Sequence, residues 1–298
     1  MRYYFAPMEG LTDSVYRRLH HQFFGGVDCY YMPFFSPTIH RSLTPREDRE
    51  LPMADSVAFT AVPQIMTKVP EDFLWAAEQC ANRGYKEVNV NLGCPSGTVV
   101  AKGKGSGMLR DPDMLQRFLD GIFSATPLPI SLKTRLGMES PDEFPAILEI
   151  YNRYPAKELI IHPRTRKQFY NGNLHMEMFR YAVENSSTPL CFNGDLRSAE
   201  PPAEFPQVEA VMIGRGLIAD PGMLTPEGTT VEKLKNFHDA LLEEYSVVFG
   251  SARNALFRLK ENWHYWEEFL AVDSKLCKRL RKSTDIHEYR SIVSEIFR

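Results

Sequence analysis

Cys94 stands in a sequence context that is typical of a reactive side chain. It follows residues 88–91, where two valines alternate with two asparagines in the period of two that favours a β-strand. Gly93 tolerates backbone angles that other residues avoid, and Pro95 favours an extended conformation at the cysteine before it. A loop cysteine held in this way is a candidate nucleophile or acid, whereas an arbitrary cysteine is more often a small buried hydrophobic residue. The neighbouring residues must decide between the two interpretations.

The elements that position such a residue follow a regular rhythm. Short apolar runs predict eight strands, at residues 3–6, 29–33, 58–65, 87–91, 130–135, 159–162, 190–193 and 210–213. Helical patterns lie between them, among them residues 70–83, 112–124, 142–153 and 175–184. Alternation of this kind is typical of repeated βα units and a parallel sheet. We therefore predict an α/β fold in which an eight-stranded parallel βα (TIM) barrel is followed by a small all-α helical-bundle domain.

The predicted strands end repeatedly in polar or conformationally special residues. In a βα barrel, active-site groups come from the C-terminal ends of the strands and from the loops that follow them. Buried strands have little reason to end in polar side chains, so the clustering favours a functional site, although structural hydrogen bonding explains one or two such residues equally well. The residues at these ends are Pro7, Met8, Gln64, Asn91, Cys94, Lys133, Arg135, His162, Asn193, Gly194, Gly214 and Arg215.

Two of these strand ends favour a ligand that carries a phosphate. Barrels of this type often bind phosphate in the loops after the last two strands, which here contain Asn193–Gly194–Asp195 and Gly214–Arg215. Glycines let backbone amides approach an anion, and Arg215 can add charge-assisted hydrogen bonds. The start of a helix is an equally good interpretation of a lone Gly–Arg pair, so the prediction depends on both loops together.

Lys133 and Arg135 lie on the same face of one predicted strand. Two cations inside a barrel are costly without an anionic or electron-rich partner. A reduced flavin would supply one, because negative charge develops at its N1–C2 carbonyl edge and a fixed cation stabilises that form. A surface Lys–Arg pair is the alternative, and it fits the same alternation of side chains.

The glycine-rich segment 103–107 has the composition of a nucleotide-binding loop but not its context. It lacks the spacing of a P-loop, and no predicted strand leads directly into it, as the dinucleotide fingerprint requires. We expect a mobile loop close to Cys94, in which Lys102 and Lys104 can help to hold a polyanion.

The composition limits the class of protein and its location. The chain has 298 residues with 43% hydrophobic content, 5 cysteines without a C-x-x-C pair, and a formal net charge of −3. Neither a disulfide framework nor a zinc site is indicated, so we expect no metal and a reducing cytoplasm. No apolar run approaches the length that spans a bilayer, and the first residues lack the apolar core of a signal peptide. We expect a soluble monomer, whose nucleic-acid partner, if it has one, binds a local basic patch.

A different pattern begins after residue 215. Prolines and Gly228 interrupt the chain, and Thr229 with Glu232 has the spacing of a capping box, so we place the domain boundary near residue 228. We expect about four helices beyond it, with later N-caps at Ser251, Asp273 and Asp285.

One of the C-terminal helices is rich in basic residues, namely Lys275, Lys278, Arg279, Arg281 and Lys282. Such a stripe can neutralise phosphates without reading sequence. Acidic residues lie nearby in the sequence, so a solvated helical face is an equal alternative.

Taken in order along the chain, these residues resemble the tRNA-dihydrouridine synthase family, whose members are FMN-dependent reductases of uridine in tRNA. The resemblance covers essentially the whole chain, and its motifs are specific in their order and spacing, although most are weak singly. The matching segments are 6–10 with Thr12–Asp13, Gln64, 91–95, 133–135, 162–166, 193–195 and 214–216.

The resemblance implies roles for the matching residues. Those around FMN are Pro7, Met8 and Glu9 under the isoalloxazine, Gln64, Lys133 and His162 at its polar edges, and Asn193, Gly194, Asp195, Gly214 and Arg215 at the ribityl phosphate. Cys94 matches the general acid, Asn91 a contact to the target base, and Arg135, Arg164 and Arg166 positions near substrate RNA. Residues 1–228 would form the FMN-binding barrel, and residues 229–298 a tRNA-binding domain that uses Lys275, Lys278, Arg279 and Lys282.

The implied reaction suits these residue types. Reduction of the uracil C5=C6 bond needs a hydride at C6 from reduced FMN and a proton at C5, and NADPH would reduce the flavin again. A thiol with an ordinary pKa of about 8.5 is protonated at neutral pH, so it can act as the acid on the face opposite the flavin. The base must leave its stack in the RNA, at a cost of about a few kcal/mol that flanking contacts must offset.

Two departures from the family pattern leave the target uridine open. Pro163 follows His162 where many relatives have glycine, and Tyr31–Met32–Pro33 stands where some subfamilies carry an acidic contact.

Two other functions also stay open. A flavin-dependent reductase of a free pyrimidine, as in dihydroorotate dehydrogenases, would not need the basic helix, and a non-catalytic tRNA-binding protein would not need Cys94, Lys133 and His162 together.

Overall fold

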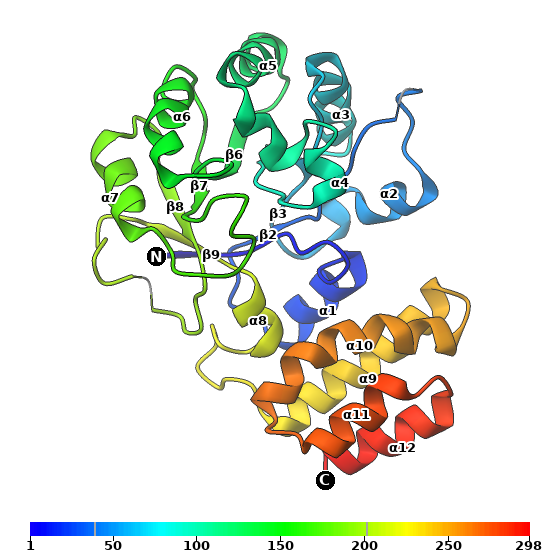
Figure 1. The fold of residues 1–298 in the computed structure, drawn as a ribbon. Helices are drawn as coiled ribbons and strands as arrows, with labels where there is room; N and C mark the ends of the chain where they lie inside the picture. The colour runs from blue at the N-terminus through cyan, green and yellow to red at the C-terminus, as the bar shows by residue number, and fades with distance from the viewer. Residues whose placement is uncertain (39, 201) are drawn as a thin grey trace. The chain divides into compact units, whose positions relative to one another are not determined.

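A computed structural model describes residues 1–38, 40–200 and 202–298 (Figure 1). The chain forms two compact units. The first unit contains Met1–Pro7, Asp28–Gly194 and Glu200–Ile213, and the second contains Met8–Val27, Asp195–Ala199 and Gly214–Arg298. The predicted boundary near residue 228 falls inside the second unit, and the functions assigned to its two sides stay predictions.

The first unit is built on a parallel sheet. Its nine strands are β1 (Arg2–Phe5), β2 (Cys29–Tyr31), β3 (Ala61–Val62), β4 (Gln64–Ile65), β5 (Val88–Leu92), β6 (Ile130–Arg135), β7 (Leu159–His162), β8 (Leu190–Asn193) and β9 (Ala210–Ile213). They pair in the order β3-β2-β1-β9-β8-β7-β6-β5-β4, with every neighbouring pair parallel.

The two ends of this order are joined by a single residue, Pro63. Proline has no backbone N–H, so it cannot donate to a strand ladder and divides the predicted strand 58–65 into β3 and β4. β3 pairs with β2 and β4 with β5, and the carbonyl of Pro63 accepts a 2.9 Å hydrogen bond from the amide of Asn89. The sheet therefore returns on itself as a barrel, which confirms the predicted fold with nine strands instead of eight.

Helices cover the outside of these strands, as Figure 1 shows for α3, α5, α6 and α7. The helices of this unit are α2 (Pro45–Glu50), α3 (Pro70–Asn82), α4 (Gly97–Val100), α5 (Pro112–Ala125), α6 (Phe144–Tyr151) and α7 (Met176–Asn185), with 3-10 turns η1 (Ala54–Ser56), η2 (Gly105–Arg110) and η3 (Pro141–Glu143). Prolines begin α3 and α5, and Asp111 caps α5 by accepting from the amide of Met114 at 3.0 Å. The predicted helices agree within a few residues, and residues 142–153 begin as a 3-10 turn.

The inside of the barrel is filled by side chains from six strands. They form one buried cluster of Tyr4, Ala6, Cys29, Tyr31, Val62, Ile160, Cys191, Ala210 and Met212. Beside it, the buried carboxylate of Glu158 accepts hydrogen bonds from the Tyr4 hydroxyl at 3.1 Å and from the Arg2 guanidinium at 3.2 Å. Burial raises the pKa of Glu158 to about 7.

The second unit is helical. It contains α1 (Ser14–Phe23), α8 (Arg215–Ala219), α9 (Val231–Val248), α10 (Ala252–Phe269), α11 (Ser274–Lys282) and α12 (Ile286–Ile296). Trp263 and Trp266 are fully buried in its core, with ring centroids 5.5 Å apart, and their indole nitrogens donate to the Tyr289 hydroxyl and the Ile218 carbonyl. Four helices follow residue 228, as predicted, and no helix of the described residues is long and apolar enough to cross a membrane.

The predicted cap of the first of these four helices is wrong by one residue. Thr230 is the N-cap of α9, and its hydroxyl accepts from the amide of Lys233 at 3.1 Å. The hydroxyl of Thr229 instead donates to Asp220 and accepts from the amide of Gly222 at 2.6 Å. Thr229 and Thr230 carry the same side chain, so either could cap the helix from sequence alone. Because Thr229 binds residues 220–222, Thr230 is the residue that caps α9. The predicted N-caps Ser251, Asp273 and Asp285 are confirmed.

Candidate active site

Cys94 is held in place through its backbone. Asn91 is the last residue but one of β5, and its side-chain oxygen accepts hydrogen bonds from the amides of Gly93 at 3.2 Å and Cys94 at 2.9 Å. This turn fixes the chain just beyond the strand end. On the other side, the carbonyl of Cys94 accepts from the hydroxyl of Ser106 at 2.8 Å. The other four cysteines are buried, whereas Cys94 is partly exposed, as a presented thiol must be.

The side chain of Asn91 belongs to a buried polar network. Its amide nitrogen donates to Gln64 at 2.7 Å, Gln64 donates to Asn89 at 2.8 Å, and Asn89 donates to the Ser131 hydroxyl at 2.9 Å. Each amide thus uses its oxygen and its nitrogen, and satisfied networks of this kind make a site rigid. Sequence reasoning missed Asn89 and Ser131 as supports. The signal was present, because Asn89 shares the face of Asn91 and pairs in register with Gln64.

Lys133 is a half-buried cation at the same edge of the barrel. Its ammonium donates to the side-chain oxygen of Asn193 at 2.8 Å, and Asn193 in turn donates to the carbonyl of Met212 at 2.8 Å. Burial lowers the pKa of Lys133 to about 8, and the positive charge of Arg135 adds to this effect. Within the part of the chain that the structure describes, no carboxylate forms a salt bridge with Lys133. The position therefore suits an anionic ligand.

Arg135 organises two loops around the cysteine. Its guanidinium donates to the backbone carbonyls of Gly93 at 2.8 Å, Thr165 at 3.0 Å and Phe169 at 2.6 Å. It also lies over the ring of Tyr170, 5.2 Å from the centroid. The side chain is buried, and burial lowers its pKa to about 10. Its assignment to substrate RNA stays a prediction, because these contacts bind protein carbonyls.

His162, the last residue of β7, contacts Arg164 just beyond the strand. The Arg164 guanidinium lies 3.2 Å from Nε2 of His162 and donates to the carbonyl of Gly172 at 2.7 Å. Arginine can only donate, so Nε2 of His162 is the acceptor in this contact. Both side chains are buried, and the histidine ring stacks on Tyr170 at 6.1 Å. Arg166 is more exposed, and its guanidinium lies over the ring of Phe169.

The glycine-rich segment packs against the turn that holds Cys94. It is close to the cysteine, as predicted, but Gly105–Arg110 form the 3-10 helix η2, of which residues 105–109 are buried, in place of the expected mobile loop. Gly105 has a φ of +56°, and a Cβ there would lie 3.0 Å from the Cβ of Cys94. A Cβ at Gly107 would lie 2.7 Å from the carbonyl of Val100. Glycines are required here because two backbone segments approach closely.

The remaining predicted flavin residues divide between the units. Pro7 and Gly194 belong to the barrel unit, and Met8, Glu9, Asp195, Gly214 and Arg215 to the helical unit. Within the helical unit, the amide of Met8 donates to the Thr12 hydroxyl at 2.9 Å, and Arg215 forms a salt bridge with Asp195. Their roles at a flavin stay predictions.

The family model described as dihydrouridine synthase matches residues 4–297 of this chain. The chain belongs to this family. Its relatives include tRNA-dihydrouridine synthase B of Pasteurella multocida, 28% identical over 236 residues that cover 78% of this chain and 70% of the relative. A probable tRNA-dihydrouridine synthase of Staphylococcus aureus is 32% identical over 234 residues, which cover 72% of this chain and 68% of the relative. The predicted family is therefore confirmed.

Solved structures that resemble this dihydrouridine synthase family member are remote in sequence. The old yellow enzyme homologue of Zymomonas mobilis is 12% identical, with a TM-score of 0.48, over 74% of this chain and 86% of that chain. A phosphoribosylanthranilate isomerase of Thermotoga maritima is 13% identical, with a TM-score of 0.43, over 74% of this chain and 91% of that chain.

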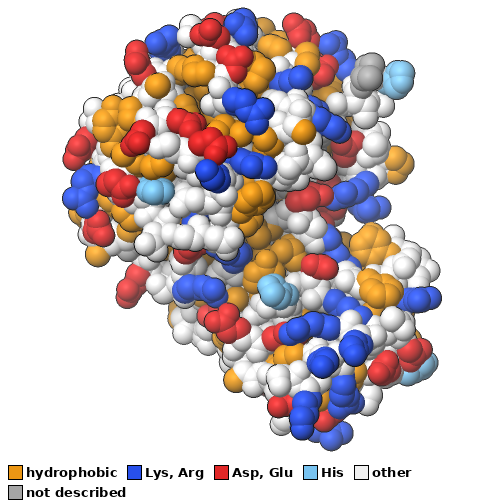
Figure 2. Space-filling view, in the orientation of Figure 1, with side chains coloured by type: hydrophobic (Ala, Val, Ile, Leu, Met, Phe, Trp, Pro, Cys, Tyr) orange, Lys and Arg blue, Asp and Glu red, His pale blue; other side chains and the backbone are white. Residues whose placement is uncertain are grey.

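The basic residues predicted on α11 of this dihydrouridine synthase family member are exposed. They are Lys275, Lys278, Arg279, Arg281 and Lys282. Figure 2 shows Lys and Arg side chains gathered over the C-terminal helices. Two of the five form salt bridges, Arg279 with Glu295 at 2.9 Å and Arg281 with Glu267 at 2.6 Å. No carboxylate of the described residues forms a salt bridge with the three lysines.

Proposed function

We propose that this dihydrouridine synthase uses FMN and NADPH to reduce the C5=C6 bond of uridines in tRNA. The observation that carries the proposal is the backbone clamp on Cys94, which presents one partly exposed thiol at the end of a barrel strand. The substrate follows from the names of the relatives, which are tRNA-dihydrouridine synthases. We infer a cytoplasmic, monomeric enzyme that needs no metal.

The chemistry of the barrel edge fits a flavin. Lys133 is a cation without a carboxylate partner among the described residues, and its neighbour Asn193 offers an amide beside it. A cation in this setting stabilises negative charge on an electron-rich ring edge. Gln64 and His162 add polar groups from β4 and β7. Pro7, Gly194 and the helical-unit residues Met8, Glu9, Asp195, Gly214 and Arg215 complete the proposed binding set.

FMN, when bound, supplies the hydride for C6 of the uracil. Cys94 supplies the proton for C5, so its S–H bond breaks as the new C–H bond forms, and the resulting thiolate regains a proton from solvent. Asn91 keeps the cysteine backbone in place during this transfer. Its own oxygen and nitrogen already have partners, so we assign Asn91 to positioning in addition to the predicted contact with the base.

The tRNA needs contacts beyond the target base. Lys275, Lys278 and Lys282 on α11 have exposed ammonium groups suited to phosphates, and Arg279 shares its charge with Glu295. Arg135, Arg164 and Arg166 border the loop after β7. We propose that Arg166 contacts RNA directly, and that Arg135 and Arg164 act chiefly by holding that loop.

The proposal is tested with purified protein, unmodified tRNA and free uridine. We expect a visible flavin spectrum, loss of that spectrum with NADPH in the absence of oxygen, and dihydrouridine formed in tRNA but not in free uridine. A protein that lacks flavin and does not take up added FMN would contradict the cofactor assignment. Equal activity on free uridine would instead indicate a reductase of free pyrimidines.

A further inference from the structure

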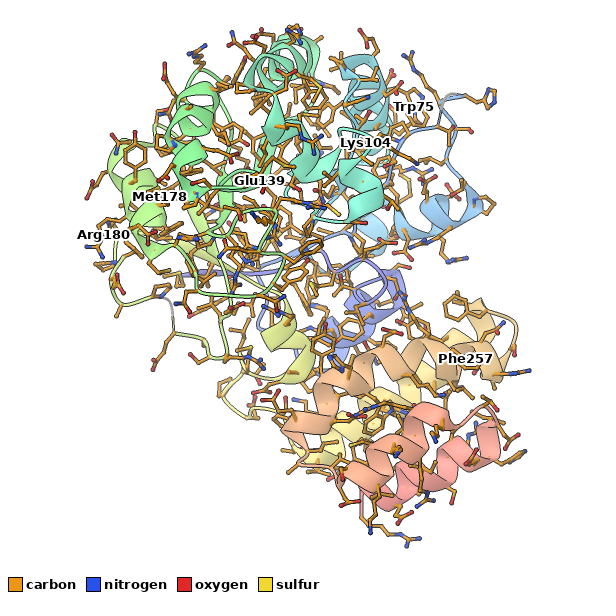
Figure 3. All side chains as sticks on the ribbon, viewed as in Figure 1. Trp75, Lys104, Glu139, Met178, Arg180 and Phe257 are labelled. Atoms are coloured by element: carbon orange, nitrogen blue, oxygen red, sulfur yellow. The ribbon has the colours of Figure 1, made fainter. Side chains whose placement is uncertain are left out.

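Three lysines lie together on the loops around the glycine-rich segment. Lys68 follows β4, and Lys102 and Lys104 flank Gly103 between α4 and η2. A Cβ added at Gly103 would lie 3.6 Å from Cδ and 3.8 Å from Nζ of Lys68, so the Lys68 side chain lies beside the glycine that separates the other two lysines. Lys68 and Lys102 are exposed, and Lys104 is half-buried (Figure 3, where it is labelled beside α3 and α4).

The charges in this cluster do not balance. Asp72 is the carboxylate that acts on Lys104, and it also forms a 3.3 Å salt bridge with Arg41. Burial lowers the pKa of Lys104, and the positive charges of Lys102 and Lys68 add to the effect, while Asp72 opposes it. Two cations and one carboxylate of the described residues thus act on Lys104, and that carboxylate is already paired with Arg41. Like charges that act on one another in this way repel, and an anionic ligand would offset that repulsion.

The lysine cluster is attached to the turn that presents the thiol. The amide of Lys104 donates to the carbonyl of Val99 at 3.2 Å, and the next two residues, Gly105 and Ser106, contact Cys94. A nucleotide whose base reaches Cys94 therefore brings its flanking phosphates to these loops. Lysines are suited to this task because they neutralise phosphates without requiring a fixed geometry.

We propose that Lys68, Lys102 and Lys104 bind the sugar-phosphate backbone of the RNA beside the uridine that is reduced. The inference rests on the proposed function and adds a further RNA-binding surface, on the barrel unit, to Arg166 and the basic helix α11. Its contacts supply binding free energy that offsets the cost of moving the base out of its stack. They do not read sequence, since they reach only the backbone.

The test compares two double variants with equal losses of charge. Lys68→Gln with Lys102→Gln removes two exposed lysines of the cluster, and Lys86→Gln with Arg117→Gln removes two exposed cations elsewhere on the barrel unit. Binding of unmodified tRNA is measured at several salt concentrations, together with the rate at which NADPH reduces the flavin. We expect the slope of log affinity against log salt to become shallower by about 1.4 to 1.8 in the cluster variant only. Flavin reduction by NADPH should be unchanged in both variants.

Two results would overturn the inference. An unchanged salt slope in the cluster variant would exclude phosphate binding by these lysines. Slower flavin reduction with normal tRNA binding would assign the cluster to the phosphates of NADPH. Failure of the proposed function would be a different result. The unmutated protein would then form no dihydrouridine in tRNA, and neither double variant would be needed to see it.

Discussion

The side-chain oxygen of Asn91 accepts a hydrogen bond from the backbone amide of Cys94 at 2.9 Å. A strand residue therefore sets the position of the cysteine three residues later, without using the sulfur. The nitrogen of the same side chain donates to Gln64 at 2.7 Å, which ties this turn to the neighbouring strand β4. The turn is thus part of the rigid barrel edge, where a proton donor needs to be held.

Replacing Asn91 tests this positioning. We predict that Asn91→Ala slows tRNA reduction by about 10²-fold, because a displaced acid transfers its proton poorly. Asn91→Asp keeps an acceptor for the Cys94 amide and should therefore be more active than Asn91→Ala. Rates are measured with saturating NADPH, and flavin reduction by NADPH should not change in either variant. An alanine variant with the full rate would contradict the role.

Arg135 should act on loops and not on RNA directly. Arg135→Lys keeps the charge but loses the planar fork that reaches three carbonyls, so we predict faster amide hydrogen exchange in residues 165–172 and slower turnover. The salt dependence of tRNA affinity should stay the same, since the carbonyl partners belong to the protein. A salt slope that falls by about 1 in Arg135→Ala would show instead that Arg135 contacts a phosphate.

Lys133 should make the flavin-free protein more stable as the pH rises. Its pKa is about 8 in the folded protein, against an ordinary value of 10.5. Between these values the unfolded chain holds a proton that the folded protein lacks, so stability increases with pH across this window. We predict that Lys133→Met is more stable than the unmutated protein at pH 7, and that this advantage shrinks towards pH 10.

Urea unfolding of the flavin-free proteins at both pH values measures this difference. Lys86→Met is the matched control, because it makes the same substitution at an exposed lysine. If the gain in the free energy of unfolding from Lys133→Met were equal at pH 7 and pH 10, the assignment of a half-buried cation with a lowered pKa to Lys133 would be contradicted. The same substitution should weaken flavin binding, since it removes the cation proposed for the ring edge.

Glu158 should give the opposite pH dependence at the inside of the barrel. Burial raises its pKa to about 7 from 4.5, so the folded protein holds a proton that the unfolded chain releases. The stability that this provides is complete below pH 4.5 and is lost as the pH rises through 7. Glu158→Gln stays neutral and should gain up to about 3 kcal/mol relative to the unmutated protein between pH 4.5 and 8. The free energy of unfolding is measured against pH for both proteins. A difference between them that is the same at every pH in that range would show that Glu158 does not titrate in this way.

Much of the fold could be predicted because its strands carry local signals. The bounds of β6, β7, β8 and β9 agree with the apolar runs, since each run is largely buried, and β6, β7 and β8 end at a polar residue while β9 ends directly before Gly214. The break at Pro63 and the cap at Thr230 could not be predicted in the same way. Both depend on partners distant in sequence, namely the strands on either side of Pro63 and the contact between Thr229 and Asp220.

The sequence indicates which residues are candidates for the site, but it does not indicate which partners their side chains contact. The strand ends identified Gln64, Asn91, Cys94 and Lys133, because polar residues are rare at such positions. The partners of Arg135 could not be predicted from the sequence, since they are backbone carbonyls of a loop thirty or more residues away. Likewise, Lys68 meets Lys102 and Lys104 only in the folded chain.

The central claim is that Cys94 donates the proton while FMN supplies the hydride. The most direct measurement is a single turnover without oxygen, in which NADPH first reduces the flavin and unmodified tRNA is then added. We predict that the unmutated protein reoxidises its flavin and forms dihydrouridine in equal amounts. Cys94→Ala should still be reduced by NADPH but should form no dihydrouridine. Formation of dihydrouridine by Cys94→Ala at the unmutated rate would contradict the claim.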